Sequence, residues 1–368
     1  MHRREFLKGS LAVSAGLAFG GLPKLARFAR ADDPEKWRTF EITTRVEVLN
    51  PVGAVRTWVP IPLLTNTNYF KREGDTWTGN YTAVKSVQYD KYGTGMVAAQ
   101  WPASEKAPFL EVTSRFMTRD RQINLTQKPA SPVQESKATL DYFRKPSKLV
   151  RTDGLVASTS KGITVGYRTD VEKARAIYDW IVENTFRDPK VMGCGIGDIS
   201  TMLETGYLGG KCADLNALYV GLARAAGLPA RDVYGIRVAN SSEFKSLGKA
   251  DDITKAQHCR AEVYLNGYGW VPVDPADVRK VVLEENQPEL LKLDDPKVTR
   301  ARAKLFGAWE MNWLPYNYSH DVKLPQSNGP EIGYLMYPQG ETANGRKDSL
   351  DPDNFKYTIK SKEIQVGA

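Results

Sequence analysis

The chain has few of the residues that most often perform catalysis: three cysteines and three histidines among 368 residues. No C-x-x-C or H-x-x-x-H spacing is present, so we expect neither a metal site nor another cofactor. Basic and acidic residues are interspersed without a basic stripe, which argues against a nucleic-acid partner. Internal repeats and low-complexity tracts are also missing. Because cysteines and histidines are so few, each candidate for a reactive centre can be considered individually.

The first 31 residues have the composition of an export signal. Arg3-Arg4 opens a basic region, an apolar stretch follows at 11–22, and Ala29-Arg30-Ala31 fits a cleavage site of small residues. The paired arginines resemble a twin-arginine signal, which implies a protein exported to the periplasm or beyond in a folded state. No other run reaches the ~18 consecutive apolar residues of a membrane-spanning helix. We expect no membrane span after cleavage.

Removal of residues 1–31 also changes the charge. The full chain has a formal net charge of +8, and this segment contributes six basic residues and one acidic residue. The mature chain is therefore close to +3, and its basic character is much weaker than the sequence pI of about 9.1 suggests.

Alternating apolar and polar residues predict β-structure in the first part of the mature chain. The predicted strands are 40–48, 55–61, 84–89, 96–101 and 110–116. Turn signals separate them, among them Gly74-Asp75. We therefore predict an N-terminal all-β, sandwich-like domain over 32–135.

The period of the apolar residues becomes helical near residue 169. Thr169 to Glu172 has the form of a capping box and predicts a helix that runs to about Asn184. A second helix is predicted over 211–226, with Cys212 in its first turn. Strands are predicted at 231–238, 258–265 and 270–274. Helices followed by antiparallel strands indicate an α+β domain, which we assign to 136–285.

The remaining residues, 286–368, are predicted to form a C-terminal extension that packs on this core. Asp295-Pro296 is typical of a helix start, and this helix should end near 306. Strands are predicted at 332–337 and 355–359.

Cys212 is the candidate nucleophile. A cysteine reacts as the thiolate, and its pKa of about 8.5 falls at a helix N-terminus or beside an imidazolium. The segment Gly209-Gly210-Lys211 places the thiol at such a terminus, where N–H groups of the first turn can stabilise an oxyanion. The alternative is a structural cysteine on the buried face of the helix, in line with Leu215, Tyr219 and Leu222.

A histidine base has two candidates, because His2 leaves with the export signal. His258 lies among polar residues on one face of its predicted strand, so the imidazole faces away from the packed side. His320 lies in an aromatic and polar stretch without a nucleophile nearby in sequence. We therefore expect His258 to be the base.

Asp274 ends the strand that pairs with the one bearing His258, where its carboxylate could hold the imidazole. The length of the loop between the two strands decides this. In a two-residue turn, Asp274 shares a face with Cys259. A three-residue loop or a bulge puts it on the face of His258. Asp277 is a competing candidate for the same role.

The odd number of cysteines matters in an oxidising compartment, because one disulfide at most can form within the chain. A disulfide between Cys194 and Cys259 would leave Cys212 free. A disulfide that includes Cys212 would remove the nucleophile.

These motifs resemble the transglutaminase-like superfamily. The resemblance rests on four stretches of sequence: Gly-Gly-Lys-Cys212-Ala-Asp-Leu-Asn-Ala-Leu-Tyr, Leu-Ala-Arg-Ala-Ala-Gly-Leu-Pro-Ala-Arg231, His258 before Ala-Glu-Val-Tyr-Leu, and Gly-Trp-Val-Pro-Val-Asp274. It extends over about 165–280 and implies a papain-like fold with a triad of Cys212, His258 and Asp274. Cys259-Arg260 departs from the alanine and aromatic residue that commonly follow the histidine, which affects the wall of the substrate cleft.

The resemblance and the local chemistry predict an exported enzyme that acts on a peptide or protein of the cell envelope. Cys212 would attack a carboxamide or peptide carbonyl, His258 would take and return the proton, and water or an amine would resolve the acyl-enzyme. We favour hydrolysis, because a cross-linking enzyme must exclude water and no sequence feature provides for that. The alternative is a catalytically inactive binding module on the same fold.

Overall fold

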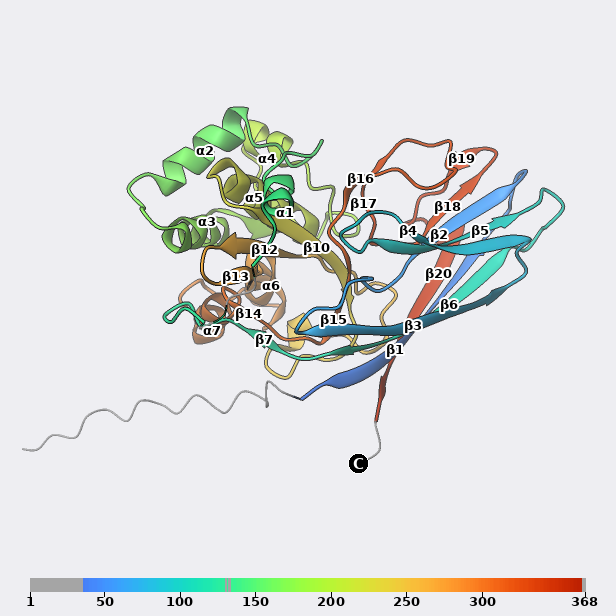
Figure 1. The fold of residues 1–368 in the computed structure, drawn as a ribbon, viewed down its shortest axis with the longest axis horizontal. Helices are drawn as coiled ribbons and strands as arrows, with labels where there is room; N and C mark the ends of the chain where they lie inside the picture. Colours follow the sequence, from blue (N-terminus) through green and yellow to red (C-terminus); the bar gives the residue numbers. More distant parts are fainter. Residues whose placement is uncertain (1–35, 130, 132–133, 366–368) are drawn as a thin grey trace, which may run out of the picture. The chain divides into compact units, whose positions relative to one another are not determined.

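Two halves of different architecture make up the computed structural model, which describes residues 36–129, 131 and 134–365. Figure 1 shows a β-sandwich on one side and helices around a smaller sheet on the other. The export signal expected at 1–31 lies outside the described residues. Within the described part of the chain, every helix is too short or too polar to cross a membrane.

The sandwich consists of two five-stranded antiparallel sheets. The first sheet contains, in spatial order, β11 (Asp251–Asp252), β20 (Phe355–Ile364), β1 (Arg38–Val48), β6 (Phe109–Thr118) and β3 (Phe70–Gly79). The second contains β19 (Gly345–Arg346), β18 (Gln339–Thr342), β2 (Val55–Pro60), β5 (Gly95–Trp101) and β4 (Ala83–Gln88).

Apolar side chains from the two sheets meet in one core. Val46 and Leu110 come from the first sheet, Val59 and Val97 come from the second, and all four are buried in the same cluster. Burial alternates along β1, as the sequence pattern predicted. Each fully buried aliphatic side chain of this size contributes about 1.5–3 kcal/mol to folding.

The turn predicted at Gly74-Asp75 is wrong. Both residues lie within β3, and the register between β3 and β6 shifts between Arg72 and Gly74. The glycine therefore marks a bulge in a continuous strand. Turns and bulges favour the same residue, so local composition did not separate them.

The structure distributes residues 286–368 over both halves. β20 pairs with β1 from Val48 to Thr39, and β18 pairs with β2, so the C-terminal end completes both sheets of the sandwich. β15 (Trp313–Asn317) instead pairs with β10 in the other half. The predicted boundaries at 135 and 285 thus separate segments that hydrogen bonds join, because strand pairing is not limited to neighbours in sequence.

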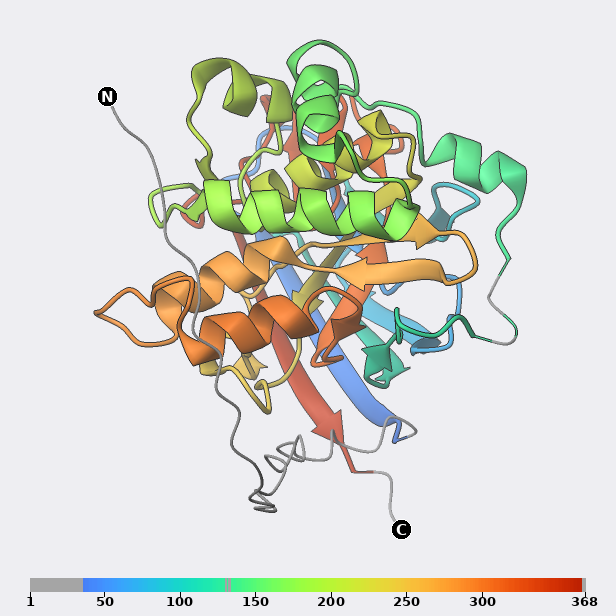
Figure 2. The ribbon, with the colours of Figure 1, turned by 90° about the vertical axis from the view of Figure 1, so that its left-hand side faces the viewer.

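The second half has a four-stranded antiparallel sheet covered by helices (Figure 2). Its strands are, in spatial order, β13 (Gly269–Val273), β12 (Arg260–Leu265), β10 (Ala230–Arg237) and β15. Its helices are α1 (Lys137–Tyr142), α2 (Gly154–Thr164), α3 (Asp170–Asn184), α4 (Ile199–Thr205), α5 (Cys212–Ala225), α6 (Pro275–Glu284) and α7 (Pro296–Lys304). The predicted α+β class with an antiparallel sheet is confirmed.

Short elements connect these parts. They are a 3₁₀ turn at Lys245–Leu247 and the strand pairs β7 (Arg121–Gln122) with β14 (Ala308–Trp309), β8 (Phe186–Arg187) with β9 (Gly209–Gly210), and β16 (His320–Val322) with β17 (Ile332–Tyr334).

The predicted helix starts are confirmed where capping signals are strong. Thr169 Oγ1 accepts a hydrogen bond from Glu172 N, and Glu172 Oε2 accepts one from Thr169 N at 2.8 Å, which completes the capping box of α3. The sequence interpretation missed α6, which starts immediately after Asp274 with a proline in its first turn. An aspartate followed by proline is a typical helix start.

Candidate active site

Cys212 is the first residue of α5, a helix whose residues are all buried from Cys212 to Arg224. The carboxylate of Asp214 fixes two segments of backbone, the residue before the helix and a loop that lies next to the helix start. It accepts hydrogen bonds from Lys211 N at 2.9 Å, from Ile196 N at 3.0 Å and from Gly197 N at 2.9 Å. Burial of the helix and these three bonds hold the thiol in a defined place.

The backbone at the start of α5 retains one N–H group for a substrate. Ala213 N donates to Cys194 O at 2.9 Å, and Asp214 N donates to Lys211 O. Within the described part of the chain, Cys212 N has no acceptor. Of the first-turn donors expected from sequence, the N–H of Cys212 itself remains to stabilise an oxyanion.

The other two cysteines lie next to Cys212. All three are free and buried, and the side chains of Cys194 and Cys259 are the neighbours that most lower the pKa of Cys212. The Cys194 thiol donates to the carbonyl oxygen of Gln257 at 3.2 Å. The nucleophile candidate is therefore the central member of a group of three thiols, which sequence spacing did not indicate.

These neighbours favour the thiolate. The hydrogen bond from Cys194 is the largest cause, followed by the one from Cys259, and the hydrogen bond and charge of His258 add to them. Together they outweigh burial and hold the pKa of Cys212 well below its ordinary value.

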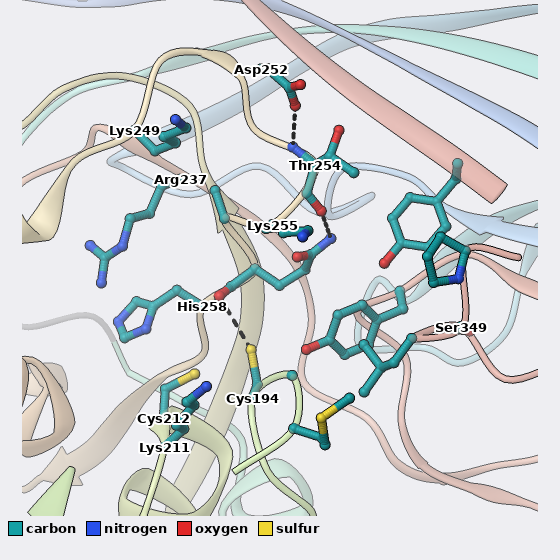
Figure 3. Close-up of a pocket in the computed structure, with 18 of the residues that line it drawn as sticks. Cys194, Lys211, Cys212, Arg237, Lys249, Asp252, Thr254, Lys255, His258 and Ser349 are labelled. Atoms are coloured by element: carbon teal, nitrogen blue, oxygen red, sulfur yellow. Dashed lines mark hydrogen bonds between the residues drawn. The ribbon is translucent and has the colours of Figure 1, made fainter. Parts of the chain in front are cut away.

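His258 precedes β12 and is fixed by its backbone. Its N–H donates to Gly235 O at 3.0 Å, and its carbonyl oxygen accepts a hydrogen bond from Trp313 Nε1 at 2.8 Å. The imidazole Nε2 lies 2.7 Å from Asp274 Oδ2 and 3.3 Å from Asp277 Oδ2. Because Nε2 is engaged in this way, Nδ1 is the ring nitrogen left for the thiol of Cys212. Figure 3 shows the ring beside the Cys212 sulfur.

Opposing effects set the pKa of His258. Burial and the charge of Arg237 both disfavour the imidazolium, whereas the carboxylates of Asp277 and Asp274 favour it. The carboxylates prevail and raise the pKa of His258 to about 9. A raised pKa on the imidazole and a lowered pKa on the thiol together describe a thiolate–imidazolium pair near neutral pH.

The loop between β12 and β13 has three residues, the longer of the two lengths considered from the sequence. Leu265 pairs with Gly269, which leaves the three residues from Asn266 to Tyr268 in the loop. Gly267 and Gly269 have φ values of 85° and 80°, which glycine adopts without strain. The three-residue loop puts Asp274 on the same face of the hairpin as His258. In agreement with this, His258 Nε2 lies 2.7 Å from Asp274 Oδ2.

The structure brings Asp277 into the same group of charges. Arg237 Nη2 donates to Asp277 Oδ1 at 2.6 Å. Burial and the charge of Asp277 raise the pKa of Asp274. Burial opposes ionisation of Asp277 as well, but Arg237 and His258 lower its pKa well below the ordinary value. The imidazole is thus held by two carboxylates, where the sequence interpretation treated them as competitors.

The sequence interpretation gave two residues of this group no role in the triad. Asn216 lies one helical turn after Cys212, and its Nδ2 donates to Cys259 O at 2.8 Å and to Asp274 Oδ1 at 3.2 Å. Arg260 Nε lies 3.6 Å from Asp274 Oδ2. For Asn216, the sequence did contain a signal: an asparagine four residues after the candidate nucleophile, within an apolar helix.

His320 has different partners. Its Nε2 lies 3.1 Å from Asp232 Oδ2, and its Nδ1 lies 3.4 Å from the Tyr234 hydroxyl. It does not line the cleft that contains Cys212.

Among the residues that the structure describes, one group has potential metal-ligand atoms close enough to share an ion: His258, Asp274 and Asp277, within 4.8 Å of one another. The guanidinium groups of Arg237 and Arg260 already pair with these carboxylates. A cation would compete with two fixed positive charges, so the donor set suits an imidazolium better than a metal.

Cys212 and His258 open into a cleft of about 760 Å³ (Figure 3). Residues before and at the start of α5 form one wall, and the segment between β10 and β12 forms another. The third wall comes from the C-terminal part of the chain and includes Tyr337, Leu350 and Tyr357. The C-terminal segment therefore shapes the cleft as well as completing the sandwich.

Comparisons with known proteins agree with this arrangement. A sequence model of the transglutaminase-like superfamily matches residues 157–275, which include Cys212, His258 and Asp274. An uncharacterized protein of Haemophilus influenzae is 35% identical over 345 residues, which are 88% of this chain and 91% of that protein.

Solved structures also match parts of the chain. A protein of Cytophaga hutchinsonii that has been proposed to be a cysteine protease superposes with a TM-score of 0.50 and 17% identity, over 89% of this chain and 98% of that one. The periplasmic domain of TgpA from Pseudomonas aeruginosa matches with a TM-score of 0.32 and 13% identity, over 61% of this chain and 88% of that one.

Proposed function

The chain belongs to the transglutaminase-like superfamily, and we propose that it is an enzyme whose Cys212 thiolate attacks the carbonyl carbon of an amide. One observation carries this proposal: the buried thiol at the start of α5 has a lowered pKa and neighbours an imidazole whose Nε2 lies 2.7 Å from Asp274. A thiolate paired with an oriented imidazolium is the arrangement that cysteine acyl transfer requires.

The proposed reaction has two stages. The Cys212 sulfur forms a bond to the carbonyl carbon, and the N–H of Cys212 stabilises the oxyanion. The imidazolium of His258 then gives its proton to the leaving amine, the C–N bond breaks, and a thioester remains. In the second stage the neutral imidazole of His258 takes a proton from water, and the water oxygen bonds to the thioester carbonyl carbon. The C–S bond then breaks, which releases the acid and restores the Cys212 thiolate and the His258 imidazolium. Asp274 and Asp277 keep the imidazole oriented throughout and stabilise its charged form whenever it carries the proton.

We favour water over an amine as the second substrate. The cleft is lined by charged and polar side chains as well as apolar ones, so it admits water to the acyl-enzyme. Peptides or proteins of the cell envelope are the proposed substrates, because the twin-arginine-type sequence at 1–31 supports export to the periplasm or beyond.

The proposal can be tested without knowing the substrate. The rate of alkylation of Cys212 by iodoacetamide, followed by peptide mass spectrometry, should show a titration well below the ordinary thiol pKa of about 8.5. His258→Ala should move that titration toward the ordinary value. His320→Ala replaces the other described histidine and should leave it unchanged.

The inactive binding module predicts a different result. Without a need for the thiolate, Cys212 should react slowly and with an ordinary pH profile in the wild type. Identical profiles for the wild type and His258→Ala would also reject the enzyme proposal.

A further inference from the structure

Among its charged residues, the cleft around Cys212 has a much larger proportion of basic ones than the whole chain has. The chain has 51 basic and 43 acidic residues. Within the cleft, Asp252 is the acidic residue of the lining, against six basic ones: Arg187, Lys211, Arg237, Lys249, Lys255 and Lys280. The imbalance is therefore a local property of this surface.

Three of the basic residues have acidic partners behind the cleft wall. Arg237 pairs with Asp277 at 2.6 Å. Arg187 and Lys280 share one carboxylate, that of Glu284, at 2.6 and 3.4 Å. Two carboxylates thus offset three cations, and this deep part of the cleft keeps a positive charge.

The other three are lysines without an ion pair among the described residues. Lys211 directly precedes the nucleophile candidate, whereas Lys249 and Lys255 lie in the segment between β10 and β12. Figure 3 shows Lys211 beside Cys212, Lys249 above Arg237 and Lys255 next to Thr254. Asp252 lies near Lys249, but it is exposed and its Oδ1 accepts a hydrogen bond from Thr254 N at 3.0 Å.

We propose that the cleft selects an acidic peptide, with carboxylate groups on both sides of the amide that Cys212 attacks. This inference rests on the proposed function, because the cysteine chemistry requires an amide. A cleft with one sign of charge concentrates ligands of the opposite sign and speeds their capture. Apolar side chains in the same lining, such as Tyr337 and Leu350, suit a peptide with carbon-rich side chains.

Two alkylating reagents measure the charge of the cleft directly. Iodoacetate and iodoacetamide have similar size and attack the same thiolate, but only iodoacetate is negatively charged. The ratio of their rates at Cys212 therefore reports the local potential and cancels the pKa of the thiol. We expect this ratio to exceed that of a small free thiol about threefold or more, and to fall as salt rises from about 0.05 to 0.5 M.

A matched pair of charge-reversal variants localises the effect. Lys249→Glu with Lys255→Glu should lower the iodoacetate preference about threefold or more and remove most of its salt dependence. Lys85→Glu with Lys161→Glu makes the same change of net charge at two exposed lysines outside the cleft lining, and should leave the ratio unchanged. Equal ratios in the two double variants would overturn the proposal.

Peptides provide the second measurement. Three peptides that differ only in having Glu, Gln or Lys on both sides of a central glutamine are added in excess, and protection of Cys212 against iodoacetamide is compared. The Glu peptide should protect best, and the Lys249→Glu, Lys255→Glu variant should reverse the order. Equal protection by all three peptides contradicts an acidic substrate.

The two proposals can fail separately. The pH profiles of the wild type and His258→Ala test the nucleophile and do not depend on the charge of the cleft. The reagent ratio and the peptide order test the charge and do not depend on a low thiol pKa. A reactive Cys212 without preference for anions would overturn only the substrate class.

Discussion

The two halves of the molecule differ in how much charge they bury. In the sandwich, ion pairs such as Arg45–Glu47 lie at the surface, with the arginine side chain 39% exposed. In the helical half, Arg237, His258, Asp274 and Asp277 are all at most 3% exposed. Exposed pairs contribute about 0.2–1 kcal/mol each, whereas burying a charge costs several kcal/mol before any partner compensates. In the helical half, the residues that carry this cost are those of the candidate active site.

The comparison implies that stability and reactivity are separable in this protein. A change in the apolar core of the sandwich should weaken folding without altering the titration of Cys212. A substitution at Cys194, next to Cys212, should alter that titration more than the fold. Four predictions, in order of decreasing effect, test this separation.

The largest effect is expected for Cys212→Ser. Amide turnover should fall at least about a thousandfold, because a serine hydroxyl is not ionised by a neighbouring imidazole as a thiol is. The substitution is nearly isosteric, so the thermal unfolding midpoint should change little. Turnover of an amide peptide and thermal unfolding measure the two quantities. Unchanged turnover would exclude Cys212 as nucleophile.

The counterpart in the sandwich is Leu110→Ala. Leu110 is fully buried in the sandwich core, and its truncation should lower the free energy of unfolding by about 2–5 kcal/mol. Denaturant titration measures this loss. The pH profile of Cys212 alkylation in the folded variant should match that of the wild type. A shifted profile would show that the sandwich core and the site are coupled.

Cys194 offers a smaller and more selective test. Cys194→Ala removes the thiol whose hydrogen bonding most lowers the pKa of Cys212, so this pKa should rise. Cys194→Ser keeps a donor and should raise it less. Alkylation rates across pH give both values, and equal shifts in the two variants would rule out the hydrogen bond as the cause.

The smallest effect concerns stability against pH. The raised pKa of His258 stabilises the fold fully below the unfolded value of about 6.5, and this contribution is lost as pH rises through about 9. The lowered pKa of Cys212 acts in the opposite direction, since its contribution grows with pH until the unfolded value of about 8.5. The two contributions offset each other between about pH 6.5 and 8.5.

Cys212→Ser removes only the thiolate contribution. The free energy of unfolding should then fall more steeply with pH over this window than in the wild type, as denaturant titrations at several pH values can measure. His258→Ala should show the reverse change. Parallel curves for all three proteins would contradict the paired charges.

The starts of helices could be predicted from the sequence because they depend on residues that are close together along the chain. The capping box at Thr169 predicted the start of α3, and the glycines before Cys212 predicted a helix that begins at the thiol. The hairpin had two possible registers, and the sequence alone left the choice between them open. The register in the structure, with Leu265 opposite Gly269, has the three-residue loop.

Tertiary structure decided the features that join distant segments. Cys194 and Cys259 reach the sulfur of Cys212 from different elements, and Arg237 meets Asp277 across 40 positions of sequence. The positive cleft likewise combines lysines of separate segments with a C-terminal wall. Periodicity and capping report interactions within a few residues, so the sequence by itself determined the elements and the reactive residue types. Only the packing of those elements decided the partners of the thiol and the charge of the space around it.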